Sequence, residues 1–317
     1  TTLPDSQRYL LVPEGQPVPR GLDEDVSILQ EPLQNIYLVA SGAMDMFASL
    51  DAVDQIRFSG QKQENWYIQT AKDAMAAGDM IYAGKYSKPD YELLVSEGCD
   101  LAIENRMITH SPEVVEMLQS FDIPVMIEYS SYEQHPLGKV EWVKFFGALT
   151  GKEAEAEEAF AEQTEILEEV ESGEKTGKTI AFFFVSSNGL IQVRQSTDYI
   201  PKLIELAGGR YIFENLEDSG SGRSTLNMQV EDFYAGAKDA DILIYNSSID
   251  GGVTTVDELI GKCNILKDFK AVQEGQVYCT TNDMYQQSMA IGYLLQDMHT
   301  VLTDDDTAKL RYLFLLQ

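Results

Sequence analysis

The chain has 317 residues and carries 23 Lys and Arg against 52 Asp and Glu, for a formal net charge of -29. That length is too great for one small core and suits two lobes of about 120–150 residues each. A chain this acidic repels the phosphate backbone of DNA and RNA, and a nucleic-acid partner is therefore not expected. No apolar run approaches the roughly 20 residues of a membrane-spanning helix. Three widely spaced cysteines exclude a zinc ribbon or a disulfide framework, although one pair could still bridge.

The chain opens on Thr1 rather than Met. We expect a mature or truncated chain that lacks any export signal or lipid-anchoring cysteine. Residues 1–34 are rich in proline and acidic side chains, which predicts an extended lead-in with little regular structure.

Residues 35–140 alternate short apolar runs with helical patterns, which predicts an N-terminal α/β lobe around a largely parallel sheet. Lys88-Pro89-Asp90 and Ser111-Pro112 are typical of helix starts, because proline costs least in the first turn. The expected strands are 36–40, 56–58, 81–84, 100–103 and 124–127, and the expected helices begin near 43, 88 and 111.

From Val140 a helical pattern continues for about 30 residues, which predicts a connecting helix over 141–173. Ten glutamates lie between residues 151 and 174. We interpret them as a solvated helix face, because a metal site would need carboxylates that converge from several elements.

The alternation then restarts and predicts a C-terminal α/β lobe over 174–317. Asn188-Gly189 joins two apolar runs and predicts a β-hairpin. The expected strands are 179–185, 190–194, 242–245 and 276–279; helices are expected at 198–207, from about 256, and at the end of the chain. The predicted fold is therefore two Rossmann-like lobes with mostly parallel sheets, joined by a single long helix, with a ligand cleft between the lobes.

No catalytic motif is present. The only histidines are His110, His135 and His299, and none has the spacing of a zinc site; there is no Gly-x-Ser-x-Gly elbow and no phosphate-binding loop. This favours a binding protein over an enzyme. A two-lobed enzyme of the nitrogenase-like cluster class is the less favoured alternative, because only Cys279 follows the pattern of a strand end.

Ligands of open α/β sheets lie beyond the carboxyl ends of the strands, so the residues there are candidate ligand contacts. They are rich in Tyr, Met, Ser and Asn, which suits a bulky, partly apolar ligand with polar edges. Trp66 joins them from an aromatic stretch after the second strand. In the first lobe the candidates are Ser41, Met44, Trp66, Glu104, Asn105, Arg106, Tyr129 and Tyr132. In the second they are Ser187, Asn188, Arg194, Asn246, Ser247, Ser248, Thr281, Asn282 and Tyr285.

One long segment carries a family resemblance. Residues 132–149 read YEQHPLGKVEWVKFFGAL and are followed by GKEAEA at 151–156. The segment resembles the approach to the inter-lobe helix of bacterial ABC-transporter substrate-binding proteins of the helical-backbone type (class III), which take iron–siderophore, haem and cobalamin ligands. Further matching stretches cover 36–50, 84–103, 200–213, 240–245 and 269–278, so the resemblance extends over nearly all of residues 28–300.

The resemblance implies a monomeric extracytoplasmic receptor, periplasmic or lipid-anchored at the cell surface, that delivers its ligand to a membrane permease. A single crossing helix would restrict lobe motion. It also implies one acidic permease-docking residue on each lobe, which here are Asp45, in place of the usual Glu, and Glu231.

The leading expectation for the ligand is a ferric siderophore or similar metal chelate, with cobalamin or haem as the alternative. Three scattered histidines argue against a bare metal ion, and no intrinsic cofactor or direct metal ligand is expected. Arg106, Arg194 and Arg223 could offset an anionic chelate. Haem would need an axial ligand, and the candidates are Tyr129, Tyr132, Met284 and Tyr285.

Overall fold

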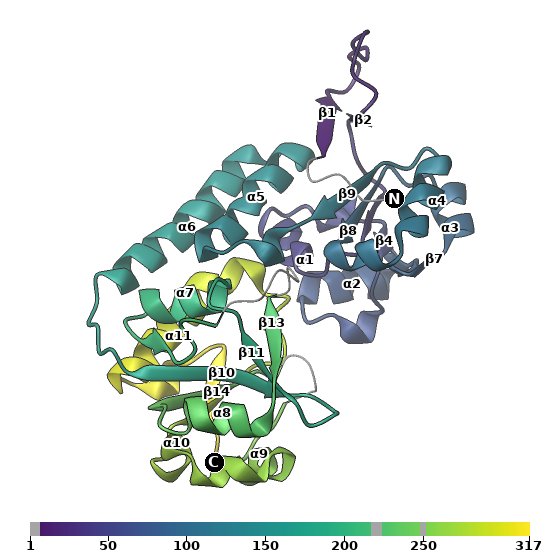
Figure 1. The fold of residues 1–317 in the computed structure, drawn as a ribbon. Helices are drawn as coiled ribbons and strands as arrows, with labels where there is room; N and C mark the ends of the chain where they lie inside the picture. Colours follow the sequence, from purple (N-terminus) through teal and green to yellow (C-terminus); the bar gives the residue numbers. More distant parts are fainter. Residues whose placement is uncertain (1–6, 217–223, 248–251) are drawn as a thin grey trace. The chain divides into compact units, whose positions relative to one another are not determined.

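The structure is a computed structural model that describes residues 7–216, 224–247 and 252–317. It divides into two compact units (Figure 1). Unit 1 comprises Thr1–Ser131 and Glu141–Phe160, and unit 2 comprises Tyr132–Val140 and Ala161–Gln317. Both are built from sheets and helices, which confirms the predicted α/β class. The predicted boundaries at 34, 140 and 173 stay predictions.

Unit 1 is built on a five-stranded sheet in which every pair of neighbours is parallel. The strand order is β5-β4-β3-β8-β9. From β3 the chain adds β4 and β5 on one side of the sheet. It then returns to the other side of β3, where it adds β8 and β9. The strands are β3 (Ile36–Leu38), β4 (Phe58–Ser59), β5 (Ile81–Tyr82), β8 (Leu101–Asn105) and β9 (Val125–Glu128).

Four short helices accompany this sheet: α1 (Ala43–Ser49), α2 (Gln69–Ala77), α3 (Tyr91–Ser96) and α4 (Pro112–Ser120). Buried side chains of α3 and α4 pack with alternate residues of the strands in one apolar cluster, so these two helices cover one face. Pro112 occupies the first turn of α4, as predicted.

The predicted start of α3 is wrong. Pro89 lies in β7 (Lys88–Pro89), which pairs antiparallel with β6 (Gly84–Lys85). The helix starts after Asp90, whose carboxylate accepts a hydrogen bond from the Leu93 amide at 3.1 Å. A Cβ on Gly84 would lie 2.3 Å from the carbonyl oxygen of Lys88, so the tight β6–β7 turn requires glycine there.

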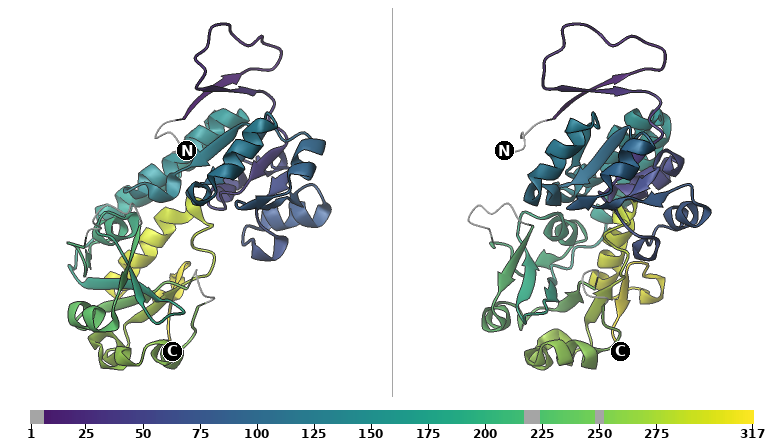
Figure 2. Two further views of the ribbon diagram at one scale, coloured as in Figure 1. Left: turned by 45° about the vertical axis from the view of Figure 1, so that its right-hand side comes forward. Right: turned by 90° about the vertical axis from the view of Figure 1, so that its right-hand side faces the viewer.

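The prediction of an N-terminal lead-in without regular structure is also wrong. The strands β1 (Arg8–Val12) and β2 (Val26–Gln30) form a parallel pair, which the two views of Figure 2 show side by side. The pairing is long-range, so neither short run signals it by itself. Val12 and Leu29 are buried, whereas most of the intervening loop is exposed.

The expected continuous helix from Val140 is two helices, α5 (Pro136–Thr150) and α6 (Glu153–Glu171). Gly151 takes a φ of +70°, which ends α5. The ammonium group of Lys144 in α5 lies 3.7 Å from the ring centre of Phe160 in α6. A Cβ atom on Gly147 would lie 2.5 Å from the Cβ atom of Ala156. The chain therefore reverses, and the two helices pack antiparallel over these residues. The residues of α6 belong to both units.

Unit 2 is built on a mixed sheet of order β13-β11-β10-β14-β15-β16, with β12 also paired to β10. The pairs of β10 with β12 and β14, and of β14 with β15, are parallel; the others are antiparallel. The strands are β10 (Thr179–Val185), β11 (Ile191–Arg194), β12 (Arg210–Tyr211), β13 (Thr225–Met228), β14 (Ile242–Tyr245), β15 (Val277–Thr280) and β16 (Leu313–Leu315).

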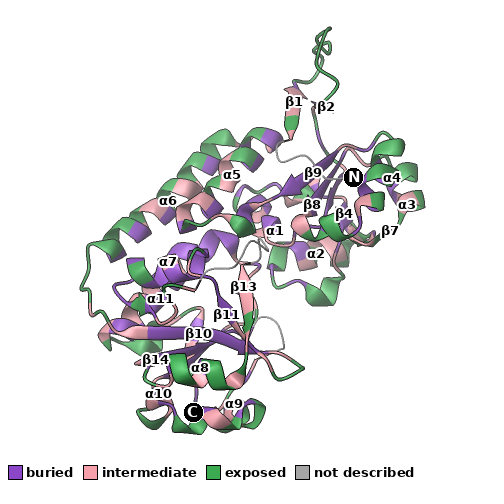
Figure 3. Ribbon diagram, in the orientation of Figure 1, coloured by how far each residue is buried: buried purple, intermediate pink, exposed green. Residues whose placement is uncertain are grey.

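The hairpin of β10 and β11 is confirmed, and Gly189 has the positive φ (+80°) that its turn requires. Strand β10 is almost entirely buried (Figure 3). The prediction that helices close the chain is wrong, because β16 follows the last helix. The helices of unit 2 are α7 (Tyr199–Leu206), α8 (Val230–Ala237), α9 (Val256–Lys262), α10 (Lys270–Gln273) and α11 (Ile291–Thr303).

Candidate functional site

A hollow of about 330 Å³ opens in unit 1 at the carboxyl ends of four parallel strands. It lies beside the switch between β3 and β8, where the strand order reverses direction and where open α/β sheets bind their ligands. Its lining residues are Val39, Ser41, Gly60, Gln61, Lys62, Asn65, Tyr82, Lys85, Tyr86 and Asn105.

Each strand contributes through the residues that end or follow it. Ser41 follows β3, Lys62 follows β4, Lys85 follows β5, and Asn105 ends β8. A Cβ atom on Gly60 would lie only 2.8 Å from the Cα atom of Val39. Glycine is therefore needed at this position, where the segment after β4 passes close to the backbone that follows β3. The side chain of Asn105 is fixed, because its Oδ1 accepts from the Met107 amide at 2.8 Å.

The hollow is cationic in an otherwise acidic chain. Lys62 and Lys85 both line it, and among the described residues of its lining none carries a carboxylate. The only ion pair that the described part of the chain gives Lys62 is with Glu64, at 3.9 Å and largely exposed, and it gives Lys85 none. Exposed ion pairs of this kind contribute only about 0–1 kcal/mol to the free energy of folding. Both ammonium groups are therefore available to an anionic ligand, and Tyr82 and Tyr86 add aromatic surface with polar tips.

Of the candidates in unit 1, Ser41 and Asn105 line the hollow. Met44 and Trp66 do not: they are 0 % and 1 % exposed, and the indole of Trp66 donates to the Ser59 hydroxyl at 3.1 Å. Both are core residues that do not line the hollow, so their role as ligand contacts stays a prediction without support from this geometry. Arg106 and Tyr129 are half-buried outside the lining, and Tyr132, which belongs to unit 2, is exposed.

Glu104 is also a core residue, although it ends in a carboxyl group. It is 0 % exposed, and neither carboxyl oxygen has a hydrogen-bond partner among the described residues. Burial raises its pKa to about 8, so the group is neutral at pH 7. Its side chain is enclosed and does not line the hollow, so the prediction of Glu104 as a ligand contact also lacks support from this geometry.

In unit 2 the structure brings Arg194, Asn246 and Tyr285 together. The phenol oxygen of Tyr285 accepts from the guanidinium of Arg194 and from the Asn246 amide, the latter at 2.6 Å. The guanidinium also pairs with Asp198 at 3.3 Å, and both of these side chains are buried. The positive charge of Arg194 is therefore balanced inside the unit.

The other candidates of unit 2 lie around the same strand ends. Ser247 is buried and its hydroxyl donates to the carbonyl of Thr280. Thr281 is half-buried, and its backbone amide donates to the Tyr312 carbonyl at 2.9 Å. Asn282 is exposed, as are Ser187 and Asn188 in the β10–β11 turn. Arg223 and Ser248 lie outside the described residues.

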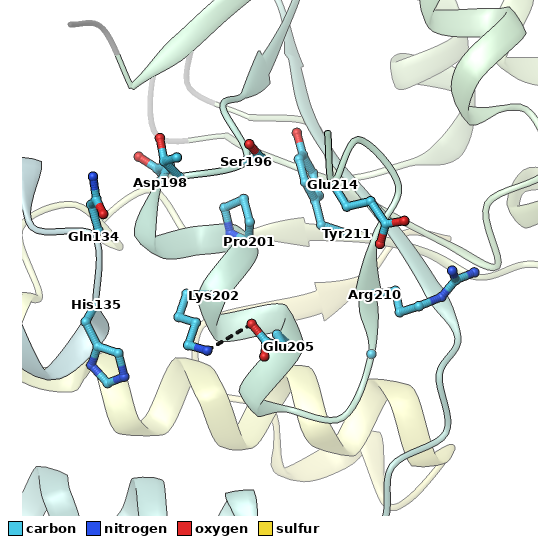
Figure 4. Close-up of a pocket in the computed structure, with 12 residues that line it drawn as sticks. Gln134, His135, Ser196, Asp198, Pro201, Lys202, Glu205, Arg210, Tyr211 and Glu214 are labelled. Carbon is cyan, nitrogen blue, oxygen red and sulfur yellow. Dashed lines mark hydrogen bonds and ion pairs between the residues drawn. The ribbon is translucent and has the colours of Figure 1, made fainter. Parts of the chain in front are cut away.

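A second hollow, of about 480 Å³, lies in unit 2 around α7 (Figure 4). Its lining holds charges of both signs, and Lys202 and Glu205 pair at 2.9 Å. Asp198 and Tyr211 connect it to Arg194, since Tyr211 donates to the Arg194 carbonyl at 2.9 Å. None of the sequence candidates lines it. The lining residues are Gln134, His135, Ser196, Thr197, Asp198, Pro201, Lys202, Glu205, Gly209, Arg210, Tyr211 and Glu214.

The family model described as periplasmic binding protein matches residues 40–284. The chain belongs to the periplasmic binding protein family. It is accordingly a binding protein and not an enzyme, as the absence of catalytic motifs in the sequence indicated.

One sequence relative and two solved structures of similar fold match this chain. An uncharacterised lipoprotein of Methanocaldococcus jannaschii is 24 % identical over 93 % of this chain and 72 % of its own length. The periplasmic haem-binding protein HutB of Vibrio cholerae superposes with a TM-score of 0.67 at 14 % identity, covering 86 % of this chain and 99 % of that one. The periplasmic catecholate-siderophore binding protein VctP of Vibrio cholerae superposes with a TM-score of 0.65 at 13 % identity, covering 85 % and 94 %.

The two acidic residues that the resemblance singled out lie near helix starts of this periplasmic binding protein, one in each unit. Asp45 is half-buried in the first turn of α1, and Glu231 is exposed in the first turn of α8. The described residues contain no group of three His, Cys, Asp or Glu side chains that could hold a metal ion. The part of the chain that the structure describes includes no helix long and apolar enough to span a bilayer.

Sequence reasoning missed the two lysines of the unit 1 hollow. A signal for them was present, because Lys62 stands three residues after the end of β4 and Lys85 three residues after the end of β5. The sequence candidates of this unit follow the strands expected at 36–40, 100–103 and 124–127, with Trp66 alone taken from beyond the second strand, so neither lysine is among them.

Proposed function

We propose that this protein is the receptor of an ABC importer that captures a ferric siderophore or similar anionic metal chelate outside the cytoplasm and delivers it to a membrane permease. The observation that carries the proposal is the hollow at the carboxyl ends of β3, β4, β5 and β8, with Lys62 and Lys85 on its wall and no carboxylate among its described lining residues.

Charge and shape both support this ligand class. Iron(III) held by catecholate or carboxylate groups forms bulky anions, and a chain of net charge -29 would repel them unless it offered local positive charge. The ammonium groups of Lys62 and Lys85 supply charge-assisted hydrogen bonds to ligand oxygens. Tyr82 and Tyr86 supply flat apolar surface for the organic part of the chelate. The siderophore and haem ligands of the two Vibrio cholerae relatives agree with this class.

Haem is the second candidate, and the two tyrosines favour it specifically. A phenol oxygen can serve as an axial ligand of haem iron, and Tyr82, which is 40 % exposed, lines the hollow. The sequence candidates for that role fit less well, because Met284 is buried and the Tyr285 oxygen already accepts two hydrogen bonds. Cobalamin, the other alternative that the resemblance implied, gains no specific support.

The test is a titration of the purified protein with a ferric tris-catecholate, a ferric hydroxamate, haemin and cyanocobalamin, followed by absorption. We expect binding of one chelate class tighter than roughly 10 μM. For an anionic chelate, Lys62→Ala and Lys85→Ala should each weaken affinity by about tenfold, or ~1.4 kcal/mol. Lys88→Ala is the matched control, because Lys88 is an exposed lysine of β7 outside the hollow. Unchanged affinity in both hollow variants would overturn the assignment of the site.

The proposal extends to delivery and location. Asp45 and Glu231 would meet basic residues of the permease, one from each unit, and so set the register of docking. The receptor would act as a monomer, either in a periplasm or held at the cell surface by a lipid anchor. The lipoprotein relative supports an anchored form.

A further inference from the structure

The hairpin of β6 and β7 carries two of the residues that line the unit 1 hollow. Lys85 lies in β6, and Tyr86 lies in the turn that follows it. The hairpin forms a two-stranded sheet of its own, whereas the strands whose ends form the rest of the hollow belong to the five-stranded sheet. A two-stranded hairpin is only marginally stable in isolation. Its position at the hollow therefore depends on the contacts that tie it to the rest of unit 1.

One carbonyl at the base of the hairpin points away from it. The Asp90 amide donates to the Ala83 carbonyl at 2.8 Å, so these two residues form a hydrogen-bonded pair. In an antiparallel ladder, such pairs alternate with pairs whose N–H and C=O groups point away from the partner strand. The next pair, Gly84 and Pro89, is of this second kind. The Gly84 carbonyl therefore points out of the hairpin and needs a donor from elsewhere in the unit.

That donor is the hydroxyl of Tyr37, which donates to the Gly84 carbonyl at 2.8 Å. Tyr37 lies in β3, the central strand of the sheet, is 0 % exposed, and packs in the apolar cluster that α3 and α4 cover. Burial raises the pKa of Tyr37 well above its ordinary value, so the hydroxyl keeps its proton and remains a donor. The base of the hairpin is thus attached to the middle of the five-stranded sheet.

We propose that Tyr37 is a positioning residue of the unit 1 hollow: its hydroxyl holds the β6–β7 hairpin so that the ammonium group of Lys85 lies on the wall. Tyr37 does not line the hollow itself, so it acts on a ligand only through the hairpin. Gly84 precedes Lys85 directly, and a shift of the anchored carbonyl therefore moves the lysine. Lys62 follows β4 and does not depend on this anchor. The inference rests on the proposed function, since Lys85 matters to binding only if the hollow takes an anionic ligand.

The test is a double-mutant cycle on the full chain, with a ferric tris-catecholate as the probe. Tyr37→Phe removes the hydroxyl but keeps the ring that fills the core, and it should weaken affinity by about three- to tenfold. In the Lys85→Ala background the same substitution should have little further effect, because the ammonium group that it displaces is already absent. In the Lys62→Ala background it should keep its full effect.

Tyr9→Phe is the matched control. It removes another tyrosine hydroxyl of unit 1 that donates to a main-chain carbonyl, that of Val125 at 3.1 Å, and Tyr9 does not line the hollow. Affinity for the probe should be unchanged in this variant. A general loss of stability in Tyr37→Phe would weaken binding alike in the Lys62→Ala and Lys85→Ala backgrounds, so the difference between them isolates the positioning role.

Hydrogen exchange gives a second readout that needs no ligand. In Tyr37→Phe the Asp90 amide at the base of the hairpin should exchange faster than in wild type. The Ile81 amide, which donates to the Arg57 carbonyl at 3.0 Å, should exchange at the wild-type rate. Tyr9→Phe should alter neither amide.

The two proposals fail in different ways. A wild-type protein that does not bind the probe counts against the proposed anionic ligand, and the exchange of Asp90 then decides the role of Tyr37. Asp90 exchange that is the same in Tyr37→Phe and wild type overturns the positioning role. So does a loss of affinity that is equally large in the Lys62→Ala and Lys85→Ala backgrounds.

Discussion

Arg194 and Asp198 form an ion pair of 3.3 Å whose two side chains are only 7 % and 3 % exposed. The same carboxylate accepts from the Ile200 amide at 3.0 Å and so caps α7. Although burial disfavours the charge of Arg194, the neighbouring Asp198 and then Tyr285 raise its pKa above the ordinary value. One carboxylate therefore ties β11, α7 and the Tyr285 loop together.

The first prediction follows from this pair. Asp198→Ala removes the cap and leaves a buried guanidinium unpaired, so we expect it to lower the free energy of unfolding by about 3–5 kcal/mol. Asp198→Asn keeps an oxygen that can cap α7 but removes the negative charge. It should therefore lower the free energy of unfolding by most of the same amount, because the buried guanidinium of Arg194 would have no opposite charge beside it. Glu205→Ala breaks the exposed pair with Lys202 and should cost only ~0–1 kcal/mol. Urea denaturation measures all three; equal losses in Asp198→Asn and Glu205→Ala would contradict the argument.

The second prediction concerns Glu104 and pH. In the folded protein its pKa is raised by burial from 4.5 to about 8. Between these values the folded protein holds a proton that the unfolded chain releases, so this group makes stability fall as pH rises and then level off above pH 8. Glu104→Gln should remove that contribution and be more stable than wild type by on the order of 4 kcal/mol at pH 8, with no gain at pH 4.

Glu113→Gln is the control for that measurement, because Glu113 is exposed on α4. Thermal melts of the three proteins from pH 4 to pH 9 decide the matter. A difference between Glu104→Gln and wild type that stays constant with pH would refute the buried, neutral carboxyl.

The third prediction uses the chain's two tryptophans. Trp66 adjoins Asn65, which lines the unit 1 hollow, so a bound iron chelate or haem should quench its fluorescence by energy transfer. Quenching should persist in Trp142→Phe and largely disappear in Trp66→Phe. Because Trp66 is buried, Trp66→Phe must first be shown to bind with wild-type affinity by absorption. Quenching that follows Trp142 instead would place the ligand away from the hollow.

The fourth prediction separates capture from delivery. Asp45→Ala and Glu231→Ala should fold and bind the chelate like wild type, because neither residue lines a hollow. Uptake into cells or reconstituted vesicles should slow in each and slow further in the double variant, since charges at a docking interface set encounter and register. The competing role of Asp45 is to stabilise the start of α1 through the helix dipole, which would lower the melting temperature and leave uptake intact.

The sequence predicted strands most accurately where the pattern within a single segment is enough to identify the strand. Strands β10 and β14 begin and end at the predicted residues, because long apolar runs stop at turn residues there. It predicted poorly where pairing is long-range. Strands β12, β13 and β16 are short, and only their partners β10, β11 and β15 make them strands.

One difference in the fold and one in the candidate site have a related cause. The apolar face continues from α5 into α6, so periodicity alone did not reveal the reversal at Gly151. A strand-end position likewise does not fix the direction of a side chain. Glu104 and Asn105 are neighbours on β8, yet Glu104 is enclosed in the core whereas Asn105 lines the hollow. Alternation along the strand explains the difference, but it requires knowing which face each helix covers.

The side-chain amide of Gln7 donates to the Val125 carbonyl of β9 at 3.2 Å, on the side of the strand away from β8, and this contact spans 118 residues of sequence. A ribosome makes the chain from its N-terminus, so the glutamine is complete long before the strand it covers. When β9 docks beside β8 on the nascent chain, the group that closes its outer edge already exists. The outer side of β9 can therefore find its hydrogen-bonding partner as soon as the strand is made.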